Sequence, residues 1–358
     1  MQRRVSLPPC AVAPPEIREL LICLQPPSNE FTFIIDDCQA VHVNKKMRKY
    51  FIEYRLRVRD AATERSHTVA AIAKVYASDR GAYPHQVLTY LWERGFREDA
   101  PYAVPRPLAY LPEHCLLLQG KAPGAPLGNQ LHHPQAGPLG ARAAARWLAH
   151  LHSLSPVAGP FLQADPTANL ARYHRELRAA LPAQAARLGR LFTRLRDLFH
   201  GSPAEVPLVF THGDYHAKNV FLSTSRRGEL VEPSRYRLSD GRVTVIDFDT
   251  FGLGEPARDL GYFLAQNAIM AWLRHRSMRP AEAPGRAFLD EYTAQDGTLQ
   301  WPRMAAYIAR TFLQSLHYEL CVLHTGNLEL VNLWLDFAED ALDRTTQEAP
   351  WSPLVMEG

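Results

Sequence analysis

The sequence lacks several features that mark large classes of protein. Its five cysteines are scattered over 358 residues and none forms a CxxC pair, which argues against a structural zinc site and a disulfide framework. A reducing compartment suits such a chain, and we expect a cytoplasmic protein. No apolar run approaches the roughly 20 residues that span a bilayer. Residues 1–4 are basic like the start of a signal peptide, but the prolines at positions 8, 9, 14 and 15 interrupt any apolar segment after them.

The chain also has little net charge. Its 40 Lys and Arg residues are balanced by 37 Asp and Glu residues, a formal net charge of +3 that does not indicate a nucleic-acid partner. The charge is uneven, because residues 1–110 hold 16 basic and 12 acidic residues and residues 260–358 hold 7 and 12. A basic first part suits polyphosphate and an acidic last part suits a cationic substrate, although solvated faces explain the same bias equally well.

Length and hydrophobic patterning divide the chain into two unlike parts. A chain of 358 residues suits two lobes. Residues 49–59 alternate apolar and charged side chains, which predicts an antiparallel strand with one wet face, and residues 68–76 are expected to return as a second strand. The other elements expected in this part are strands at residues 31–35, 40–43 and 116–118 and helices at residues 16–24 and 86–94.

The second part is predicted to be mainly helical. A stretch rich in Gly and Pro, residues 120–140, leads into it. His152 ends an apolar helix and is expected to be a satisfied core histidine, while Asp259 opens another helix and is expected to cap it. Helices are expected at residues 141–154, at 170–199 with a break near Pro182, and at 259–276, 303–324 and 328–342.

The most informative residues are embedded in this helical part. Residues 211–222 read THGDYHAKNVFL, which places Asp214 five residues before Asn219 between two apolar runs. The β-rich run VTVIDFD at residues 243–249 then contains Asp247. An Asp, an Asn at this spacing and an Asp after a strand are how kinases build a metal–phosphate site. Phosphoryl transfer is therefore the leading hypothesis.

Each of these residue types suits one requirement of phosphoryl transfer. Asp214 is the candidate base that orients the substrate hydroxyl and accepts its proton. Asn219 and Asp247 offer the hard oxygen ligands that Mg²⁺ prefers, and Asp249 either joins them or braces the loop. Lys74 lies in the apolar strand AIAKV, where a buried ammonium needs an anion, and is the expected partner of the α- and β-phosphates.

Further motifs accompany this constellation in the same order along the chain: LLLQGKAPG at residues 116–124, WLAHLH at 147–152, and GLGEPARDL at 252–260. Together with the Asp214 and Asp247 segments they resemble the aminoglycoside phosphotransferase and choline kinase branch of the protein-kinase-like fold. The resemblance implies an α+β, bilobal protein-kinase-like fold. Its β-rich N-lobe would cover residues 1–118 and its mainly helical C-lobe residues 119–358, with the nucleotide between them.

The same resemblance implies a small-molecule kinase, a phosphotransferase with an alcohol group as acceptor. Such an enzyme uses ATP (or GTP) with Mg²⁺ and transfers the γ-phosphoryl group to a hydroxyl. Residues 116–124 would be the hinge strand that meets adenine, with Gln119 and Lys121 as nucleotide-binding residues. His216 stands where protein kinases carry a Lys, and no APE run follows, so a protein substrate is disfavoured. No nucleic-acid, membrane or obligate protein partner is expected.

Two departures from the family pattern leave alternatives open. No Glu in residues 83–88 stands in register to pair with Lys74, and no Gly-rich phosphate loop lies between residues 31 and 59. A turn at Asp36-Asp37, or one at residues 44–46, is expected to cover the phosphates instead. The acidic last part hints at an amine-bearing acceptor, such as an aminoglycoside or amino alcohol. The alternatives are a kinase for a sugar, amino acid or macrolide, and a non-catalytic nucleotide-binding pseudokinase.

Overall fold

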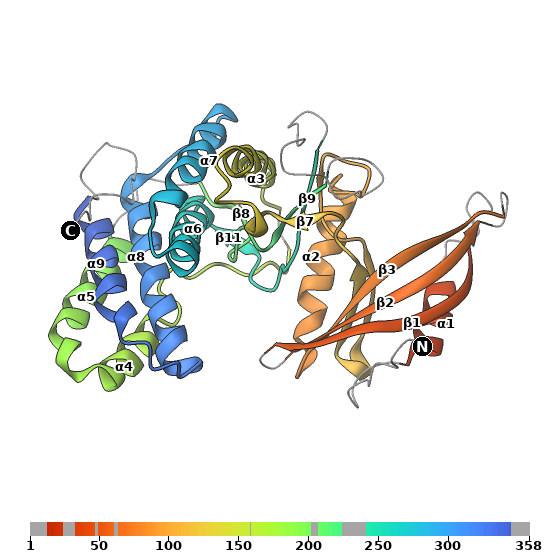
Figure 1. The fold of residues 1–358 in the computed structure, drawn as a ribbon, viewed down its shortest axis with the longest axis horizontal. Helices are drawn as coiled ribbons and strands as arrows, with labels where there is room; N and C mark the ends of the chain where they lie inside the picture. The colour runs from red at the N-terminus through yellow and green to blue at the C-terminus, as the bar shows by residue number, and fades with distance from the viewer. Residues whose placement is uncertain are drawn as a thin grey trace. The chain divides into compact units, whose positions relative to one another are not determined.

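The computed structural model describes residues 13–23, 33–46, 49–60, 64–157, 159–201, 207–223 and 241–344. The chain divides into two compact units (Figure 1). Unit 1 consists of Met1–Pro123 and Thr244–Asp249, and unit 2 of Gly124–Val243 and Thr250–Gly358. No helix among the described residues is both long enough and apolar enough to span a bilayer.

Unit 1 is built on an antiparallel sheet of five strands in the order β1-β2-β3-β6-β5. The predicted strands at residues 49–59 and 116–118 lie within this sheet, and the predicted strand at residues 68–76 does so as far as residue 75. The elements of unit 1 are α1 (Pro14–Cys23), β1 (Phe33–Lys46), β2 (Lys49–Asp60), β3 (Ser66–Val75), α2 (Ala82–Glu93), β4 (Tyr102–Ala103), β5 (Pro107–Leu111) and β6 (Leu116–Gly120).

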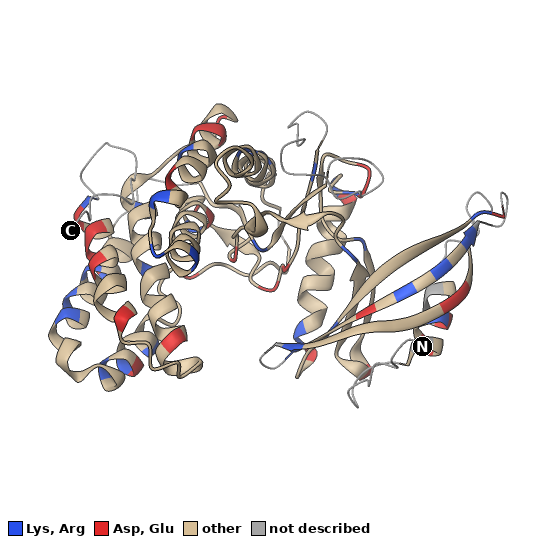
Figure 2. Cartoon of the chain, viewed as in Figure 1, with Lys and Arg blue, Asp and Glu red and all other residues tan. Residues whose placement is uncertain are grey.

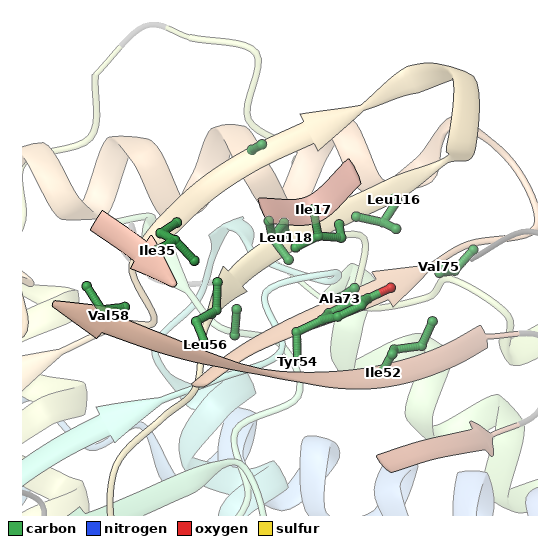
Figure 3. Close-up of a cluster of buried hydrophobic side chains, with 12 residues drawn as sticks. Ile17, Ile35, Ile52, Tyr54, Leu56, Val58, Ala73, Val75, Leu116 and Leu118 are labelled. Atoms are coloured by element: carbon green, nitrogen blue, oxygen red, sulfur yellow. The ribbon is translucent and has the colours of Figure 1, made fainter. Parts of the chain in front are cut away.

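The alternating segment forms β2 as its pattern predicts. Tyr54 and Leu56 are buried, whereas Arg55 and Arg57 between and beside them are exposed. The buried face packs against Ile17 of α1 and against β6 (Figure 3). Burial of an apolar side chain of this size stabilises a fold by about 1.5–3 kcal/mol. β2 therefore has one face in a core, and its opposite face carries the charged residues Glu53, Arg55 and Arg57.

The first strand differs from the prediction. β1 runs without interruption, so Asp36 and Asp37 lie inside a strand and not in a turn. The β1–β2 ladder shifts register between Ile35 and Asp37 and again after Ala40. Such bulges insert an extra residue into a strand, which allows a polar pair that resembles a turn to stay within the ladder. Residues 31–32 of the predicted first strand lie outside the described residues.

Unit 2 is mainly helical, as expected. The predicted break near Pro182 separates two helices, and one helix that the sequence did not indicate, α7, starts with an EAPG sequence typical of loops. Its elements are β7 (Ala125–Pro126), α3 (Ala136–His152), α4 (Leu170–Ala180), α5 (Ala185–His200), β8 (Val209–Thr211), β9 (Val220–Ser223), β11 (Gly252–Gly254), α6 (Ala257–His275), α7 (Glu282–Ala294), α8 (Trp301–His317) and α9 (Glu329–Asp343). β10 (Arg242–Val245) leads from unit 2 into the second segment of unit 1.

Candidate active site

The loop that carries Asp214 and Asn219 in unit 2 is fixed at both ends by short strands. β8 enters the loop and pairs with β11, with Thr211 opposite Gly252. β9 leaves it and pairs with β7, with Leu222 opposite Ala125. Because each end is hydrogen-bonded to a different partner strand, the eight residues between them are confined to a small range of conformations.

Asp259 holds this loop by its backbone. Its carboxylate is fully buried and accepts hydrogen bonds from the backbone N–H groups of His212 and Gly213, both at 2.7 Å. His152 Nε2 lies 3.3 Å from the same carboxylate, and its Nδ1 is 2.8 Å from the Tyr292 hydroxyl. Burial raises the pKa of Asp259, but His152 and neighbouring positive charge lower it overall, which keeps the group ionised.

The prediction that Asp259 caps its own helix is therefore wrong. α6 begins at Ala257, so Asp259 lies in its first turn, and its carboxylate reaches a loop 46 residues earlier in the chain. An acid in the first turn of a helix suggests a local cap, because sequence shows only the local donors. His152 is the satisfied core histidine that the sequence predicts.

Gly213 has a backbone conformation and surroundings that only glycine fits. Its φ is +81°, in the left-handed region. A Cβ atom there would lie 2.2 Å from Nη2 of Arg258 and 2.5 Å from the Thr250 carbonyl oxygen. Arg258 occupies this space because its guanidinium donates to the Thr211 hydroxyl at 2.7 Å and to the Thr250 carbonyl at 3.0 Å. The close approach ties the loop to the start of α6.

Asn219 and Asp214 are joined directly. The Asn219 amide nitrogen donates to the Asp214 carbonyl oxygen at 3.0 Å and to its carboxylate at 3.3 Å. Since nitrogen and oxygen of an amide lie on opposite sides of one carbon, the Asn219 oxygen faces away from Asp214, where it can accept a cation. Burial raises the pKa of Asp214, but His216, 3.7 Å away, and the Tyr262 hydroxyl lower it overall. Asp214 is therefore a carboxylate at neutral pH.

The other candidate residues form a charged cluster in unit 1. Lys74 is 3% exposed and donates to Asp247 Oδ1 at 2.9 Å, with Asp249 Oδ2 at 3.8 Å. Lys49 pairs with Asp249 Oδ1 at 3.0 Å. The acid that pairs with Lys74 is thus Asp247, and not a residue of α2. Lys49 is a member of the cluster that the sequence analysis missed, because it appeared there only as the polar start of a strand.

The two carboxylates of this cluster have divergent acidities. Burial raises the pKa of Asp247, but the Lys74 ammonium lowers it strongly overall. Burial and the hydrogen bond with Asp247 raise the pKa of Asp249. Two carboxylates that share a buried site repel each other, and a cation between them relieves that repulsion. Their hard oxygens fit Mg²⁺, which usually binds one or two carboxylates and keeps waters or phosphate oxygens. No group of three or more acidic, His or Cys ligands occurs among the described residues.

The other two predicted nucleotide-binding residues, Gln119 and Lys121, lie on or beside the face of the unit 1 sheet that carries Lys74. Gln119 pairs with Ile72, and Lys74 lies two positions further along β3, so their side chains point to the same face, away from the α1 core. Gln119 is buried. The Lys121 ammonium binds both carboxylate oxygens of Glu53 at 2.9 Å, and its backbone N–H donates to Ala70. The charge of Lys121 is therefore already engaged within the sheet.

Comparison with known proteins gives one match to a family model. The model described as "Phosphotransferase enzyme family" matches residues 47–307. No curated protein matches the chain.

Solved structures share the fold at low sequence identity. Amicoumacin kinase hAmiN in complex with AMP-PNP, Ca²⁺ and Ami is similar with a TM-score of 0.56 and 14% identity, covering 85% of this chain and 88% of that one. Choline kinase from Cryptosporidium parvum Iowa II has a TM-score of 0.55 and 10% identity, covering 92% and 95%. The streptomycin–ATP–APH(2")-IIa ternary complex has a TM-score of 0.51 and 14% identity, covering 93% and 99%. These likenesses confirm the predicted α+β kinase-like fold class.

Proposed function

This chain belongs to the phosphotransferase enzyme family, and on that premise we propose that it transfers the γ-phosphoryl group of ATP or GTP to a hydroxyl of a small molecule. Membership confirms that the chain is a phosphotransferase, and the alcohol group as acceptor is part of the proposal. The identities of the nucleotide, the metal ion and the acceptor are what we propose here. Relatives of the same fold have been solved with ATP and with AMP-PNP and Ca²⁺, which supports a nucleotide as donor.

The observation that carries the proposal is the hydrogen-bonded pair of Asp214 and Asn219 in a loop clamped by Asp259. A module that only binds nucleotide has no need of an ionised carboxylate held in this way. In the proposed reaction, the Asp214 carboxylate orients the acceptor hydroxyl and accepts its proton as the new O–P bond forms. The bond between the γ-phosphorus and the bridging oxygen breaks, and the nucleoside diphosphate leaves.

The charged cluster of unit 1 would serve the phosphates. We expect Lys74 to bind α- and β-phosphate oxygens and Gln119 and Lys121 to contact the nucleotide from the hinge side. Mg²⁺ held by Asp247 and Asp249 would neutralise negative charge on the phosphate oxygens. In unit 2, the Asn219 oxygen is the further metal ligand that the sequence predicts. The ion pair of Lys74 with Asp247 fits this role, because it keeps the ammonium charged and positioned in a buried environment.

The test is Mg²⁺-dependent nucleotide consumption with a panel of hydroxyl compounds: amino alcohols, aminoglycosides, sugars, hydroxy amino acids and macrolides. We expect nucleoside diphosphate release only when an acceptor is present. Asp214→Asn should lower turnover by about 10²–10⁴-fold, the usual contribution of a general base, while nucleotide binding is retained. Asp290→Asn, at an exposed position of α7, is the matched control and should leave turnover unchanged.

The rival function is a pseudokinase that binds nucleotide without turning it over. The sequence favoured it only through the missing helix Glu, and Asp247 supplies the acidic partner of Lys74 instead. Nucleotide binding without turnover for any acceptor in the panel would favour the pseudokinase. Turnover that survives Asp214→Asn would contradict the proposed role of Asp214.

A further inference from the structure

Several acidic residues of the last hundred positions are engaged in ion pairs, most of them between helices. Asp336 and Glu339 of α9 both pair with Arg187 of α5, and Figure 2 shows the acidic residues along α9 and the basic ones along α5. Glu291 of α7 pairs with Arg146 of α3 at 2.6 Å. Two further pairs are Asp343 with Arg194 and Asp340 with Arg344. These five acids therefore serve helix packing, which weakens the charge argument for an amine-bearing acceptor.

Unlike these paired acids, Arg310 of α8 is a charged residue without an ion-pair partner among the described residues. It is partly buried. Its guanidinium makes two long hydrogen bonds, to the Ala168 carbonyl at 3.3 Å and to the Gln314 side chain at 3.4 Å. Nε is shielded from solvent and has no hydrogen-bond partner in the described part of the chain. Burial lowers the pKa of Arg310, since the charged form is poorly compensated.

Two acids that could compete for Arg310 already have other hydrogen-bond partners. The Asp165 Oδ1 accepts hydrogen bonds from the backbone N–H and the hydroxyl of Thr167, at 2.8 and 2.6 Å. The Thr167 hydrogen bond, and to a smaller extent the positive charge of Arg310, lower the pKa of Asp165. On α4, the Glu176 carboxylate is held by His317 at 2.6 Å. The guanidinium has five N–H donors in a planar arrangement that matches two oxygens of one anion. Ala168 and Gln314 use only two of these donors.

Arg310 lies close to the residues that surround Asp214. α6 and α8 approach closely, since a Cβ on Gly261 would lie 2.8 Å from the Met304 carbonyl oxygen and from the Tyr307 Cβ. Tyr262 follows Gly261, and Arg310 follows Tyr307 by less than one turn. The Tyr262 hydroxyl interacts with the Asp214 carboxylate. Burial raises the pKa of Tyr262, and the positive charge of Arg310 partly offsets that rise. Tyr262 is therefore the link between the candidate base and an under-used cation, all within unit 2.

We propose that Arg310 binds an anionic group of the acceptor, a carboxylate or a phosphate ester, and so places the acceptor hydroxyl beside Asp214. The inference rests on the proposed function and narrows it to hydroxylated anions. An oxyanion would accept hydrogen bonds from the Arg310 N–H groups that Ala168 and Gln314 leave unused. It would also neutralise the partly buried charge of the guanidinium. A cationic acceptor, by contrast, would bring a second positive charge to an uncompensated one.

The test compares acceptors in matched pairs that differ by one anionic group, at constant ionic strength with saturating ATP and Mg²⁺. The pairs are glycerate against glycerol, L-serine against serinol, and glycerol 3-phosphate against glycerol. We expect the anionic member to be favoured by at least about tenfold in kcat/KM, the scale of a charge-assisted hydrogen bond. The glycerate and glycerol 3-phosphate arms distinguish a carboxylate from a phosphate ester.

The variants separate binding from structure. Arg310→Gln should raise KM for the anionic acceptor about 10–100-fold with little change in kcat and no change for the neutral member. Arg310→Lys keeps the charge but loses the planar pair of donors. Its KM for the anionic acceptor should lie between those of the wild type and Arg310→Gln. Arg190→Gln, at an exposed position of α5, is the control. Thermal melting of each variant shows whether it is folded.

A second measurement keeps the inference distinct from the proposed function. Isothermal titration of glycerate, glycerol 3-phosphate and glycerol into wild type and Arg310→Gln, with AMP-PNP and Mg²⁺ present, reports binding without turnover. If no compound is phosphorylated, the proposed function loses support and titration alone decides the inference. Preferential binding of an anion that Arg310→Gln abolishes supports it. Equal binding of neutral and anionic compounds, or kinetics unchanged in Arg310→Gln, overturns it.

Discussion

Lys74 donates a 2.9 Å hydrogen bond to Asp247, a residue 173 positions later in the chain. Both belong to unit 1, so the pair joins β3 to the segment that follows β10. Asp247 has a φ of +74°, a left-handed conformation that costs a residue other than glycine about 1–3 kcal/mol. Strain of this kind persists only where the surroundings enforce it. The Lys74 ion pair with Asp247 and the Lys49 ion pair with Asp249 are contacts that hold this segment to the sheet of unit 1.

Replacing Lys74 tests this pair. Lys74→Met fills the same space without the charge and leaves the Asp247 carboxylate without its main partner. We expect KM for ATP to rise more than tenfold and the free energy of unfolding to fall by about 1–3 kcal/mol, below the range for fully buried pairs because Asp247 is 29% exposed. Nucleotide titration and denaturant unfolding measure the two effects.

The control for the stability effect of that substitution is Lys121→Met. The pair of Lys121 with Glu53 is more exposed, with a lysine side chain 47% accessible, and exposed pairs contribute at most about 1 kcal/mol. Equal losses of stability in the two variants would show that burial of the Lys74 pair has no energetic consequence.

His216 is expected to set the acid limb of the activity profile. Burial raises the pKa of Asp214, and His216 is the largest of the influences that lower it overall. A base acts only when deprotonated, so its activity is lost as pH falls through its pKa. In His216→Ala the pKa of Asp214 should rise, and the acid limb of kcat/KM should move to higher pH. A limb that does not move would mean that another group controls it.

Gly213→Ala should disable the loop. The added methyl would overlap Arg258 and the Thr250 carbonyl oxygen, and the left-handed backbone adds strain. We expect a loss of at least about 1–3 kcal/mol in the free energy of unfolding together with a large loss of turnover. The matched control is Gly189→Ala in α5, where a Cβ meets no atom within 4 Å. That change should stabilise the helix by up to about 1 kcal/mol. Similar effects at the two glycines would contradict the role of close approach.

Local pattern predicted most of the elements. The alternation of Tyr54 and Leu56 with Arg55 and Arg57 led to β2, and Pro182 marked the break between α4 and α5. Both signals are local: burial periodicity is visible over a few residues, and proline lacks the backbone N–H that a helix interior needs. The interpretation of Asp36-Asp37 as a turn was wrong because a bulge, which depends on the partner strand, absorbed the polar pair.

The candidate site was predictable as a set of residue types but not as a set of contacts. The motifs around Asp214 and Asp247 indicated phosphoryl transfer, and the family match confirms that class. The partners of these residues lie far along the chain, as Asp259 does from His212 and Lys49 from Asp249. No local signal marks such pairs, since each member resembles an ordinary helix or strand residue in its own segment.

Asp259→Asn addresses a contact of this kind. The carboxylate accepts two short backbone hydrogen bonds, from His212 and Gly213. An amide can present only one oxygen, so its NH₂ group would face one of these donors and leave it unsatisfied. The variant loses a hydrogen bond to a charged group and leaves a buried N–H donor without a partner. We therefore expect a loss of about 2–4 kcal/mol in the free energy of unfolding near pH 7, and most of the turnover should be lost.

The pH dependence of that loss identifies its origin. The folded-state pKa of Asp259 is lowered overall, so its stabilisation is present above the unfolded pKa of about 3.9. The stabilisation is lost as pH falls from there through the folded pKa. The difference in unfolding free energy between wild type and Asp259→Asn should therefore be constant from pH 7 to about 5 and shrink below about 4. Chemical denaturation at several pH values measures it. A gap that persists unchanged at low pH would trace the effect to altered packing and not to the carboxylate charge.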